Sequence, residues 1–383
     1  MARLEREALA QNQRIRESFI RTFIRDPSGR LFANVAEKDF NDGSHYEGQL
    51  QGGRRAGKGI YLYQNGDVYM GDWADDRFNG NGIYIFARGE RYEGQLSNGL
   101  KQGTGNYFYT NGNKYEGQWF DDKKHGKGTY TYLLTNEQYI GEWQHGRKHG
   151  QGTFRFSYGD VFEGRFENGV KSGYGTLRFK NGTTFSGNWV NDKASGECEM
   201  KYANGDVFRG EYIQGKKNGF GVYTYRSGTT IEGEFKDDKV FGNSMVKYKN
   251  GDSYNGQLNN GLKEGQGVYV YANGDRYTGQ WAEDAKHGRG IYSYHSSGDT
   301  YDGQWVQGIK SGRGTYKFGN EDVYEGNFSE GVKNGQGRFR WRTGEVYEGE
   351  WRQDMMNGAG YITDRNGEQK RVRFRMNVIE ELD

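Results

Sequence analysis

The sequence has 383 residues, and its 53 lysine and arginine residues against 51 aspartate and glutamate residues give a net charge of +2. This balance excludes a strong overall field that would attract nucleic acid or a membrane. Only 33% of the residues are hydrophobic and 64 are glycine, so a thick core is excluded, yet 16% are aromatic, which argues against disorder. The single cysteine, Cys198, cannot form an internal disulfide, and we therefore expect a reducing compartment, the cytoplasm.

Residues 1–30 are predicted to contain an amphipathic helix over residues 2–25, which Pro27 and Gly29 end. Apolar residues recur between arginines at three- and four-residue spacings, the pattern of one helix face. The helix either folds back to cap the first repeat or pairs with a second copy, or it docks on a partner or a membrane surface. Residues 31–45 follow as a capping half-repeat, because terminal repeats are usually atypical. The residues that would dock are Leu4, Ile15, Phe19 and Phe23.

From residue 46 onward one short pattern repeats. In its clearest copy, Tyr277, Gly279 and Trp281 alternate with polar residues, and a six-residue loop leads to Gly288 and Gly290. Self-similarity at a fixed period is the mark of a repeat architecture. Most copies start 23 residues apart, and two steps are 24 residues. The fourteen copies begin at Tyr46, Tyr69, Tyr92, Tyr115, Tyr139, Phe162, Phe185, Phe208, Ile231, Tyr254, Tyr277, Tyr301, Tyr324 and Tyr347.

Each copy is predicted to form a β-hairpin, because side chains alternate in character along both of its strands. In the fourth copy, Tyr115, Gly117 and Trp119 face one side while Glu116 and Gln118 face the other. Asn-Gly-Asp turns keep the connections between copies short, so the strands must be sequential and antiparallel. We expect an all-β fold, an elongated single-layer antiparallel sheet of stacked β-hairpin repeats, which forms an open solenoid-like rod with an N-terminal α-helix.

The copies fall into two blocks, residues 46–207 and 208–369. The third loop position is always glycine or aspartate, and its order in the second seven copies repeats that of the first seven. The duplication either records ancestry alone or provides two equivalent binding surfaces. In chain order the residues are Gly53, Asp76, Gly99, Asp122, Gly146, Gly169 and Asp192, then Gly215, Asp238, Gly261, Asp284, Gly308, Gly331 and Asp354.

Residues 370–383 are predicted to form a C-terminal edge strand and tail. Val372, Phe374, Met376 and Val378 alternate with polar residues. An open strand with an apolar side tends to pair with another chain. This edge is therefore a candidate for self-association.

The pattern Tyr-x-Gly-x-Trp/Phe, six residues, then Gly-x-Gly resembles the Membrane Occupation and Recognition Nexus (MORN) repeat over residues 46 to about 368. The resemblance implies an elongated single-layer array of hairpins. It also implies roles, since MORN arrays occur in radial-spoke heads of cilia and flagella, in protist cortical and cytoskeletal scaffolds, in junctophilins at membrane contacts, and beside lipid-kinase or methyltransferase domains. Almost nothing outside the repeats is left for a catalytic domain, so we expect no enzyme. The copies that depart from the pattern carry Cys198, Ile231 and Ser244.

Two rows of residues are candidate binding sites on such a sheet. Aromatic rings line a groove for protein partners, and stacked loops would align basic residues as an edge for anionic headgroups or an acidic protein surface. An acidic column of aspartates beside this edge favours the alternative of a self-neutralising, solvated edge. The groove aromatics are Tyr115, Trp119, Tyr130, Tyr132, Tyr277, Trp281, Tyr301 and Trp305. The basic edge consists of Arg55, Lys101, Lys124, Lys148, Lys171, Lys217, Lys263, Lys286, Lys310 and Lys333.

No catalytic, metal or cofactor site is predicted. The Gly-x-Gly pairs lack the strand-to-helix context of a phosphate-binding loop, and no cysteine or carboxylate cluster accompanies the histidines. The aromatic residues are needed for the sheet, so we expect no stacking on nucleic acid.

The sequence favours a non-enzymatic structural scaffold that binds protein partners along the groove of a cytoskeletal assembly. The expected settings are the axoneme of a cilium or flagellum, in the manner of a radial spoke, or the cell cortex. The expected partners are other proteins of a large cytoskeletal complex, together with a second copy at the terminal strand. The alternative is a peripheral membrane adaptor that binds anionic phospholipids (phosphoinositides) through its basic edge and N-terminal helix.

Overall fold

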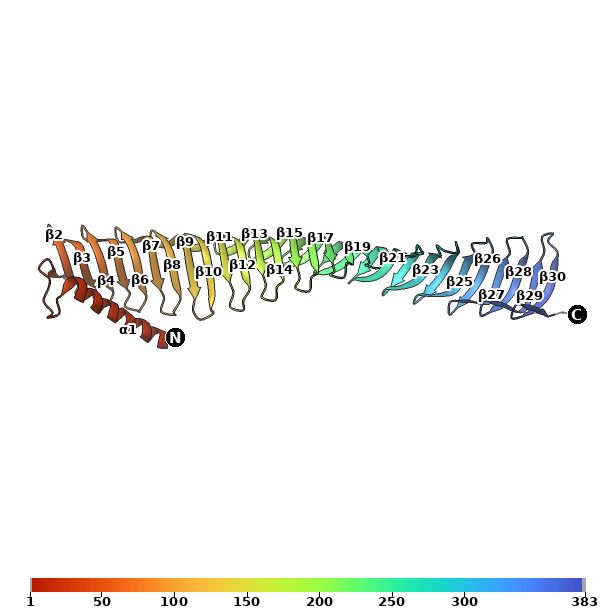
Figure 1. Cartoon of the computed structure of the whole chain (residues 1–383), viewed down its shortest axis with the longest axis horizontal. Helices are drawn as coiled ribbons and strands as arrows, with labels where there is room; N and C mark the ends of the chain where they lie inside the picture. The colour runs from red at the N-terminus through yellow and green to blue at the C-terminus, as the bar shows by residue number, and fades with distance from the viewer. Residues whose placement is uncertain (1, 381–383) are drawn as a thin grey trace. The chain divides into compact units, whose positions relative to one another are not determined.

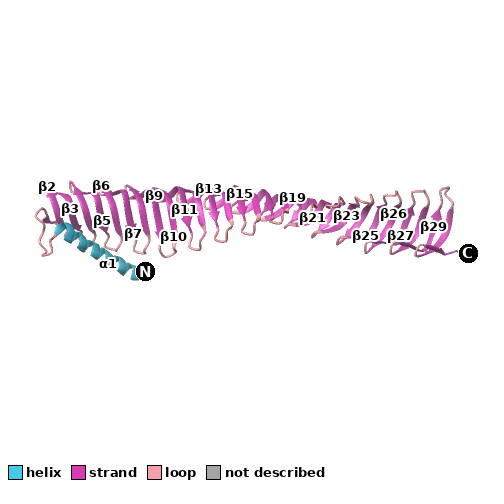
Figure 2. Cartoon of the chain, in the orientation of Figure 1, coloured by secondary structure: helices cyan, strands magenta, loops and turns pink. Residues whose placement is uncertain are grey.

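The computed structural model describes residues 2–380, and its 31 strands belong to one open antiparallel sheet (Figures 1 and 2). The predicted all-β, single-layer antiparallel fold with an N-terminal helix is confirmed. The chain divides into two compact units, residues 1–194 and 195–383. The division falls inside strand β15 (Lys193–Lys201).

The first unit begins with helix α1 (Ala2–Phe19), which continues as the π-helical turn η1 (Ile20–Ile24). Its strands pair in chain order, each antiparallel to the next. They are β1 (Ala36–Asp39), β2 (His45–Gln51), β3 (Arg54–Leu62), β4 (Val68–Ala74), β5 (Arg77–Ile85), β6 (Arg91–Ser97), β7 (Leu100–Phe108), β8 (Lys114–Phe120), β9 (Lys123–Tyr132), β10 (Glu137–Gln144), β11 (Arg147–Arg155), β12 (Val161–Glu167), β13 (Val170–Arg178) and β14 (Thr184–Val190).

The second unit continues the same hairpin order without a helix in its described residues. Its strands are β16 (Val207–Ile213), β17 (Lys216–Thr224), β18 (Thr230–Lys236), β19 (Lys239–Lys247), β20 (Ser253–Asn259), β21 (Leu262–Val270), β22 (Arg276–Ala282), β23 (Ala285–Ser293), β24 (Thr300–Val306), β25 (Ile309–Lys317), β26 (Val323–Ser329), β27 (Val332–Arg340), β28 (Val346–Arg352), β29 (Met355–Thr363), β30 (Gln369–Arg375) and β31 (Val378–Glu380).

The expected six-residue loop inside each repeat is wrong. Strand β22 runs on to Ala282, strand β23 starts at Ala285, and only Glu283 and Asp284 lie between them, both with positive φ. Two residues of positive φ form the tight turn that suits the twist of a hairpin. The strands therefore pair through most of the stretch that the sequence suggested was loop, and Lys286 lies opposite Trp281.

The leading aromatic ring of each repeat lies across the paired glycines that follow it. A Cβ atom on Gly290 would fall 2.3 Å from Tyr277 Oη, and one on Gly279 would fall 2.5 Å from Gly290 Cα. The ring is fully buried, and its hydroxyl donates to the carbonyl of Gln280 at 2.9 Å. The first glycine of the Gly-x-Gly pair has another role, since Gly288 has φ +59° beside a β-bulge at Gly279/Gln280.

Helix α1 packs on the face of the sheet opposite the aromatic rings. Ile24 is fully buried against Ile60 and Met70, and both of these residues alternate with aromatic residues that face the other side. Buried Arg91 donates to Asn12 Oδ1 at 2.8 Å, and Asn12 donates to the carbonyl of Gly89. The helix therefore covers the first repeats, in agreement with the folding-back alternative. Among residues 2–380, no helix is long and apolar enough to span a bilayer.

The two ends of the repeat array differ from expectation. At the start, the capping half-repeat contributes only the four-residue strand β1, which pairs with β2. At the end, the predicted strand through Val378 is interrupted by a turn at Met376 and Asn377, both with positive φ, and β31 pairs back onto β30. The open edge is thus the three-residue strand β31, and the tail beyond it, residues 381–383, lies outside the described residues.

Gly290→Ala is expected to lower the free energy of unfolding by about 1–3 kcal/mol, because the added methyl group must displace the Tyr277 ring from a close-packed site. The measurement is the urea midpoint followed by tryptophan fluorescence. Arg289→Ala, on the exposed opposite face of the same strand, is the matched control. Equal midpoints for the two variants would contradict the ring-on-glycine packing.

Candidate functional site

The aromatic face carries two rows of rings. The leading ring and the ring four residues later meet edge to face, as with Tyr277 and Trp281, whose centroids are 5.1 Å apart at 89°. Trp281 also donates its indole N–H to the carbonyl of Gly267 in the preceding repeat at 3.4 Å. A second row comes from the second strands, where Tyr130 and Tyr132 lie 4.5 Å apart. The first row forms the thin core, and the second row is mostly half-buried, with Tyr61 and Tyr107 as buried exceptions.

This packing corrects the predicted groove. Six of the eight predicted groove aromatics are at most 6% exposed and bind their neighbours in the sheet, so they offer little surface to a partner. They are Tyr115, Trp119, Tyr277, Trp281, Tyr301 and Trp305. Tyr130 and Tyr132 keep exposed atoms, and partner binding through them stays a prediction.

The predicted basic edge is not an edge. Its residues lie on the second strand of each hairpin, and their charged groups sit over the rings of the aromatic face. Lys124 Nζ lies 4.6 Å from the Tyr130 ring centroid and 4.7 Å from that of Trp143. The reason is the two-residue turn, which places each basic residue opposite the Trp position on the same face. The same arrangement holds for Arg55, Lys101, Lys148, Lys171, Lys217, Lys263, Lys286, Lys310 and Lys333.

Aspartate in the hairpin turn binds the basic residue of the preceding repeat. The backbone N–H of Lys101 donates to Asp122 Oδ1 at 2.9 Å, and Lys101 Nζ lies 3.4 Å from the same oxygen. Lys263 and Asp284 repeat both contacts, with an Nζ to Oδ1 distance of 3.0 Å. At these repeats, aspartate therefore neutralises the charge of the lysine, as the self-neutralising alternative expected, but the pair lies on the aromatic face.

Where the following turn residue is glycine, the ammonium group of the lysine lies over aromatic rings and forms no ion pair with the described residues. Burial lowers the pKa of Lys124 to about 8. Burial also lowers the pKa of Lys286, and the charge of Lys310 lowers it further. The pKa of Lys310 is lowered by burial as well, against a partial opposing effect of Asp354.

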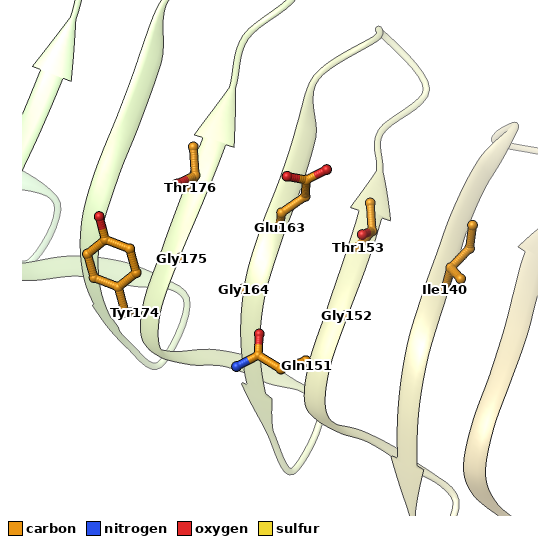
Figure 3. Close-up of a pocket in the computed structure, with 9 residues that line it drawn as sticks. All are labelled: Ile140, Gln151, Gly152, Thr153, Glu163, Gly164, Tyr174, Gly175 and Thr176. Atoms are coloured by element: carbon orange, nitrogen blue, oxygen red, sulfur yellow. The ribbon is translucent and has the colours of Figure 1, made fainter.

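The opposite face is polar and holds shallow hollows. One of them lies above the bare backbone of Gly152, Gly164 and Gly175, in strands β11 to β13 (Figure 3). The side chains around it come from strands β10 to β13 and lack a pair of catalytic groups in contact. They are Ile140, Gln151, Thr153, Glu163, Tyr174 and Thr176. This hollow is an open part of the surface, and nothing in its lining indicates a cofactor.

The residues of the predicted docking helix are unequally placed. Ile15 and Phe19 pack against the apolar cluster around Ile24, so they serve the fold. Leu4 lies half-buried near Arg91 and Phe108, while Phe23 is 39% exposed with Lys58 Nζ 5.5 Å from its ring. A docking role for the helix stays a prediction that concerns only this remaining surface.

One group of side chains has the composition of a metal site. Glu37, His45 and Glu47 have ligand atoms within 4.8 Å of one another. Arg25 pairs with both glutamates, at 3.1 Å from Glu47. A hydrogen bond to Asp39, followed by one to Glu47, raises the pKa of His45. Arg25 already supplies the positive charge that the carboxylates need, so this group is an ion-pair network that joins the helix end to β1 and β2.

Sequence reasoning missed two features of the site. The first is the aspartate contact between repeats, for which the recurring spacing of the turn Asp and the basic residue was a usable signal. The second is the part of the sheet that the helix covers. There, Ile60, Met70 and Ile83 occupy positions that are polar in most other repeats. Nothing in the pattern marked Arg91, whose buried side chain anchors Asn12.

Stacked hairpins with a thin aromatic core and two accessible faces define a β-repeat protein of the scaffold or binding class. The MORN repeat family description matches thirteen segments, and the chain belongs to this family. The matches omit residues 231–253, where Ile231 and Ser244 depart from the pattern, although the β18–β19 hairpin forms there. The matched segments are 46–68, 69–91, 92–114, 115–132, 139–161, 162–184, 185–207, 208–230, 254–276, 277–298, 301–323, 324–346 and 347–369.

Solved structures with detectable similarity are distant. The TCP domain of Drosophila melanogaster SAS-4 (dCPAP), in complex with a proline-rich motif of Ana2 (dSTIL), is 16% identical, with a TM-score of 0.29, over 47% of this chain and 90% of that chain. The TCP10 domain of Danio rerio CPAP is 12% identical, with a TM-score of 0.32, over 52% and 93%. No curated protein sequence matches. The similarity is too low for these proteins to indicate a function.

The pH dependence of stability is expected to report the buried ammonium group of Lys124. Its pKa in the folded state, about 8, lies below the usual 10.5, so the unfolded chain binds more protons between these values. Stability therefore rises as the pH increases from about 8 to 10.5. Relative to Lys124→Met, the wild-type free energy of unfolding should increase over this range, measured by urea unfolding at pH 7, 8.5 and 10 under otherwise fixed conditions.

Lys127→Met, in the same strand with an exposed side chain, is the control for removal of a lysine charge. A difference between wild type and Lys124→Met that stays constant with pH would contradict the buried ammonium group.

Asp122→Gly is expected to accelerate hydrogen exchange at the Lys101 amide, because it removes the carboxylate that accepts this N–H. Glycine occupies the same turn position in other repeats, so the backbone is unstrained. Asp122→Asn should retain protection, since Asn377 accepts the Met356 N–H in the same way at 2.7 Å. Equal exchange in both variants would show that the side chain does not hold this amide.

Proposed function

We propose that this protein is a non-enzymatic scaffold that binds protein partners along its aromatic face and holds them in a cytoskeletal assembly. The observation that supports this proposal most directly is that the two aromatic rows differ in burial. The first row is buried by packing within the sheet, while most rings of the second row and the lysines beside them remain partly exposed. Large aromatic rings and cations side by side are typical of protein-binding surfaces.

The accessible faces have different characters. Helix α1 covers part of the polar face over the first repeats, whereas no element within residues 2–380 covers the aromatic face. A partner that follows the aromatic face would meet partly exposed rings at successive repeats. Repetition of weak contacts along an extended surface is how repeat proteins reach useful affinity.

The ciliary or flagellar axoneme and the cell cortex are the settings we propose, on the basis of the roles of MORN arrays in cytoskeletal scaffolds. The membrane-adaptor alternative receives less support from the site. Its lysines lie recessed among rings, and Ile15 and Phe19 of the helix are already packed on the sheet. A planar headgroup layer would reach exposed, projecting cations more readily.

The test is site-specific photocrosslinking in the native cell. A photoreactive phenylalanine analogue is placed on the aromatic face in three variants, and on the polar face in three matched controls. We expect aromatic-face adducts with cytoskeletal proteins and few adducts from the controls. Adducts with membrane-contact proteins or lipid kinases, or adducts confined to the polar face, would contradict the proposal. The aromatic-face positions are Tyr109, Tyr132 and Tyr294, and the controls are Tyr174, Phe220 and Tyr361.

A further inference from the structure

The row of basic residues has the same interruptions in both blocks. Each block contains a run of four consecutive repeats with lysine at the basic position. Apolar residues hold that position just before and just after the run. The runs are Lys101, Lys124, Lys148 and Lys171 in the first block, and Lys263, Lys286, Lys310 and Lys333 in the second. The flanking apolar residues are Phe78 and Ala194 in the first block, and Val240 and Met356 in the second.

Each outer lysine of a run has an aspartate in the following turn, which accepts its backbone N–H, and at Lys101 and Lys263 the ammonium group also forms an ion pair with that aspartate. Lys101 pairs with Asp122 through its backbone and its ammonium group, as described above. At the other end, the backbone N–H of Lys171 donates to Asp192 Oδ1 at 2.9 Å, and this carboxylate opposes the lowering of the lysine pKa by burial. Lys263 and Lys333 have the equivalent partners Asp284 and Asp354.

The central lysines of each run have glycine instead, at Gly146 and Gly169 in the first unit. Within residues 2–380, no carboxylate lies within ion-pair distance of Lys124 Nζ or Lys148 Nζ. In the second unit, Lys286 and Lys310 likewise have glycine in the following turns, at Gly308 and Gly331, and no carboxylate of residues 2–380 lies within ion-pair distance of their Nζ atoms. Each unit therefore presents two adjacent ammonium groups without an ion pair among the described residues, although Asp192 opposes the lowering of the pKa of Lys148 and Asp354 opposes that of Lys310.

We propose that each unit binds one acidic peptide segment of a partner protein across its central lysine pair. These pairs are Lys124 with Lys148, and Lys286 with Lys310. The inference rests on the proposed function and specifies the chemistry of the partner. Carboxylates supply the charge that these ammonium groups lack, and hydrogen bonds between charged groups are the stronger ones in proteins. The half-buried rings beside each lysine give an apolar lining to the same path.

Strand spacing sets the spacing of the acidic residues. Lys124 and Lys148 lie on β9 and β11, which are two strand spacings, about 9.6 Å, apart. A polyproline II segment places residues i and i+3 on one side, about 9.3 Å apart. A peptide that crosses the strands would thus present two carboxylates in register if its acidic residues are three positions apart. Proline between them suits the aromatic lining.

The probe is a fluorescent peptide with glutamate at every third position and proline between, and its counterpart with glutamine is the control. Binding to the full-length chain is measured by calorimetry and anisotropy in about 150 mM salt, where weak surface attraction is screened. We expect two acidic peptides per chain and at least tenfold weaker binding of the glutamine peptide.

The decisive variants install aspartate in the glycine turns and leave every lysine intact. No atom lies within 4 Å of a Cβ built at Gly146 or Gly169, and the same turn position holds Asp122 at φ 62°. Gly146→Asp with Gly169→Asp should reduce the stoichiometry to one. The same change at Gly308 and Gly331 should remove the second site, so the fourfold variant should bind at least tenfold more weakly. Asp122→Gly, the reverse exchange, should preserve or strengthen binding.

Unchanged binding by the fourfold variant, or equal binding of the glutamine peptide, would overturn the proposal. Vesicles of phosphatidylserine and phosphatidylcholine test a membrane as the alternative ligand. If the vesicles bind the wild type at this salt but not the fourfold variant, and the peptide does not bind, the lysine pairs bind a membrane and the peptide proposal is overturned. A partner identified by crosslinking that binds the fourfold variant as tightly as wild type would refute the charged site alone, and leave the scaffold function intact.

Discussion

The contact between a leading aromatic ring and a pair of glycines organises this protein. In the repeat that starts at Tyr277, the ring lies across Gly279 and Gly290, which pair with each other on neighbouring strands. A side chain at either glycine would displace the ring. The contact recurs at nearly every repeat, so a sheet one layer thick gains a continuous buried row from few apolar residues. This explains how a chain with 33% hydrophobic residues folds as an ordered β-sheet.

The same contact decides which residues remain for binding. Rings that lie on glycine are buried and cannot meet a partner, so the exposed chemistry comes from the second strand of each hairpin. There the tight turn brings a basic residue opposite the Trp position, and its charged group rests on aromatic faces. The turn residue of the next repeat then decides whether a carboxylate contacts the basic residue. Aspartate accepts its backbone N–H and can also pair with its charge, as Asp284 does with Lys263, whereas glycine offers no carboxylate.

The sequence predicted the hairpins, their alternation and the sheet, because aromatic, glycine and turn residues recur at a fixed period. It did not predict where the lysines point. Charged and turn-forming residues between Trp281 and Gly288 suggested a loop, whereas Glu283 and Asp284 alone make the turn. Glutamate seldom adopts positive φ, and aspartate adopts it less readily than glycine, so the signal was weaker than an Asn-Gly pair would give.

The part of the sheet that the helix covers and the C-terminal turn show two further limits of sequence reasoning. Ile60 and Met70 are apolar where most repeats have a polar residue, and this difference indicates a covered surface. The regularity of the repeat pattern made this local difference easy to overlook. The turn at Met376 was concealed because methionine seldom adopts positive φ, although Asn377 lies one 23-residue period after Asp354, at the turn position. Its cause is the regular hairpin pairing of β30 with β31, which overrides local preference.

The most direct test of this account is an NMR measurement of through-space contacts between ring protons and glycine Hα protons, with selectively labelled tyrosine and glycine. Nuclear Overhauser effects are expected from the Tyr277 ring to the Hα protons of both Gly279 and Gly290, and equivalent effects at the other tyrosine-led repeats. Absence of these effects in an otherwise folded sample would contradict the central claim that ring-on-glycine packing holds the sheet together.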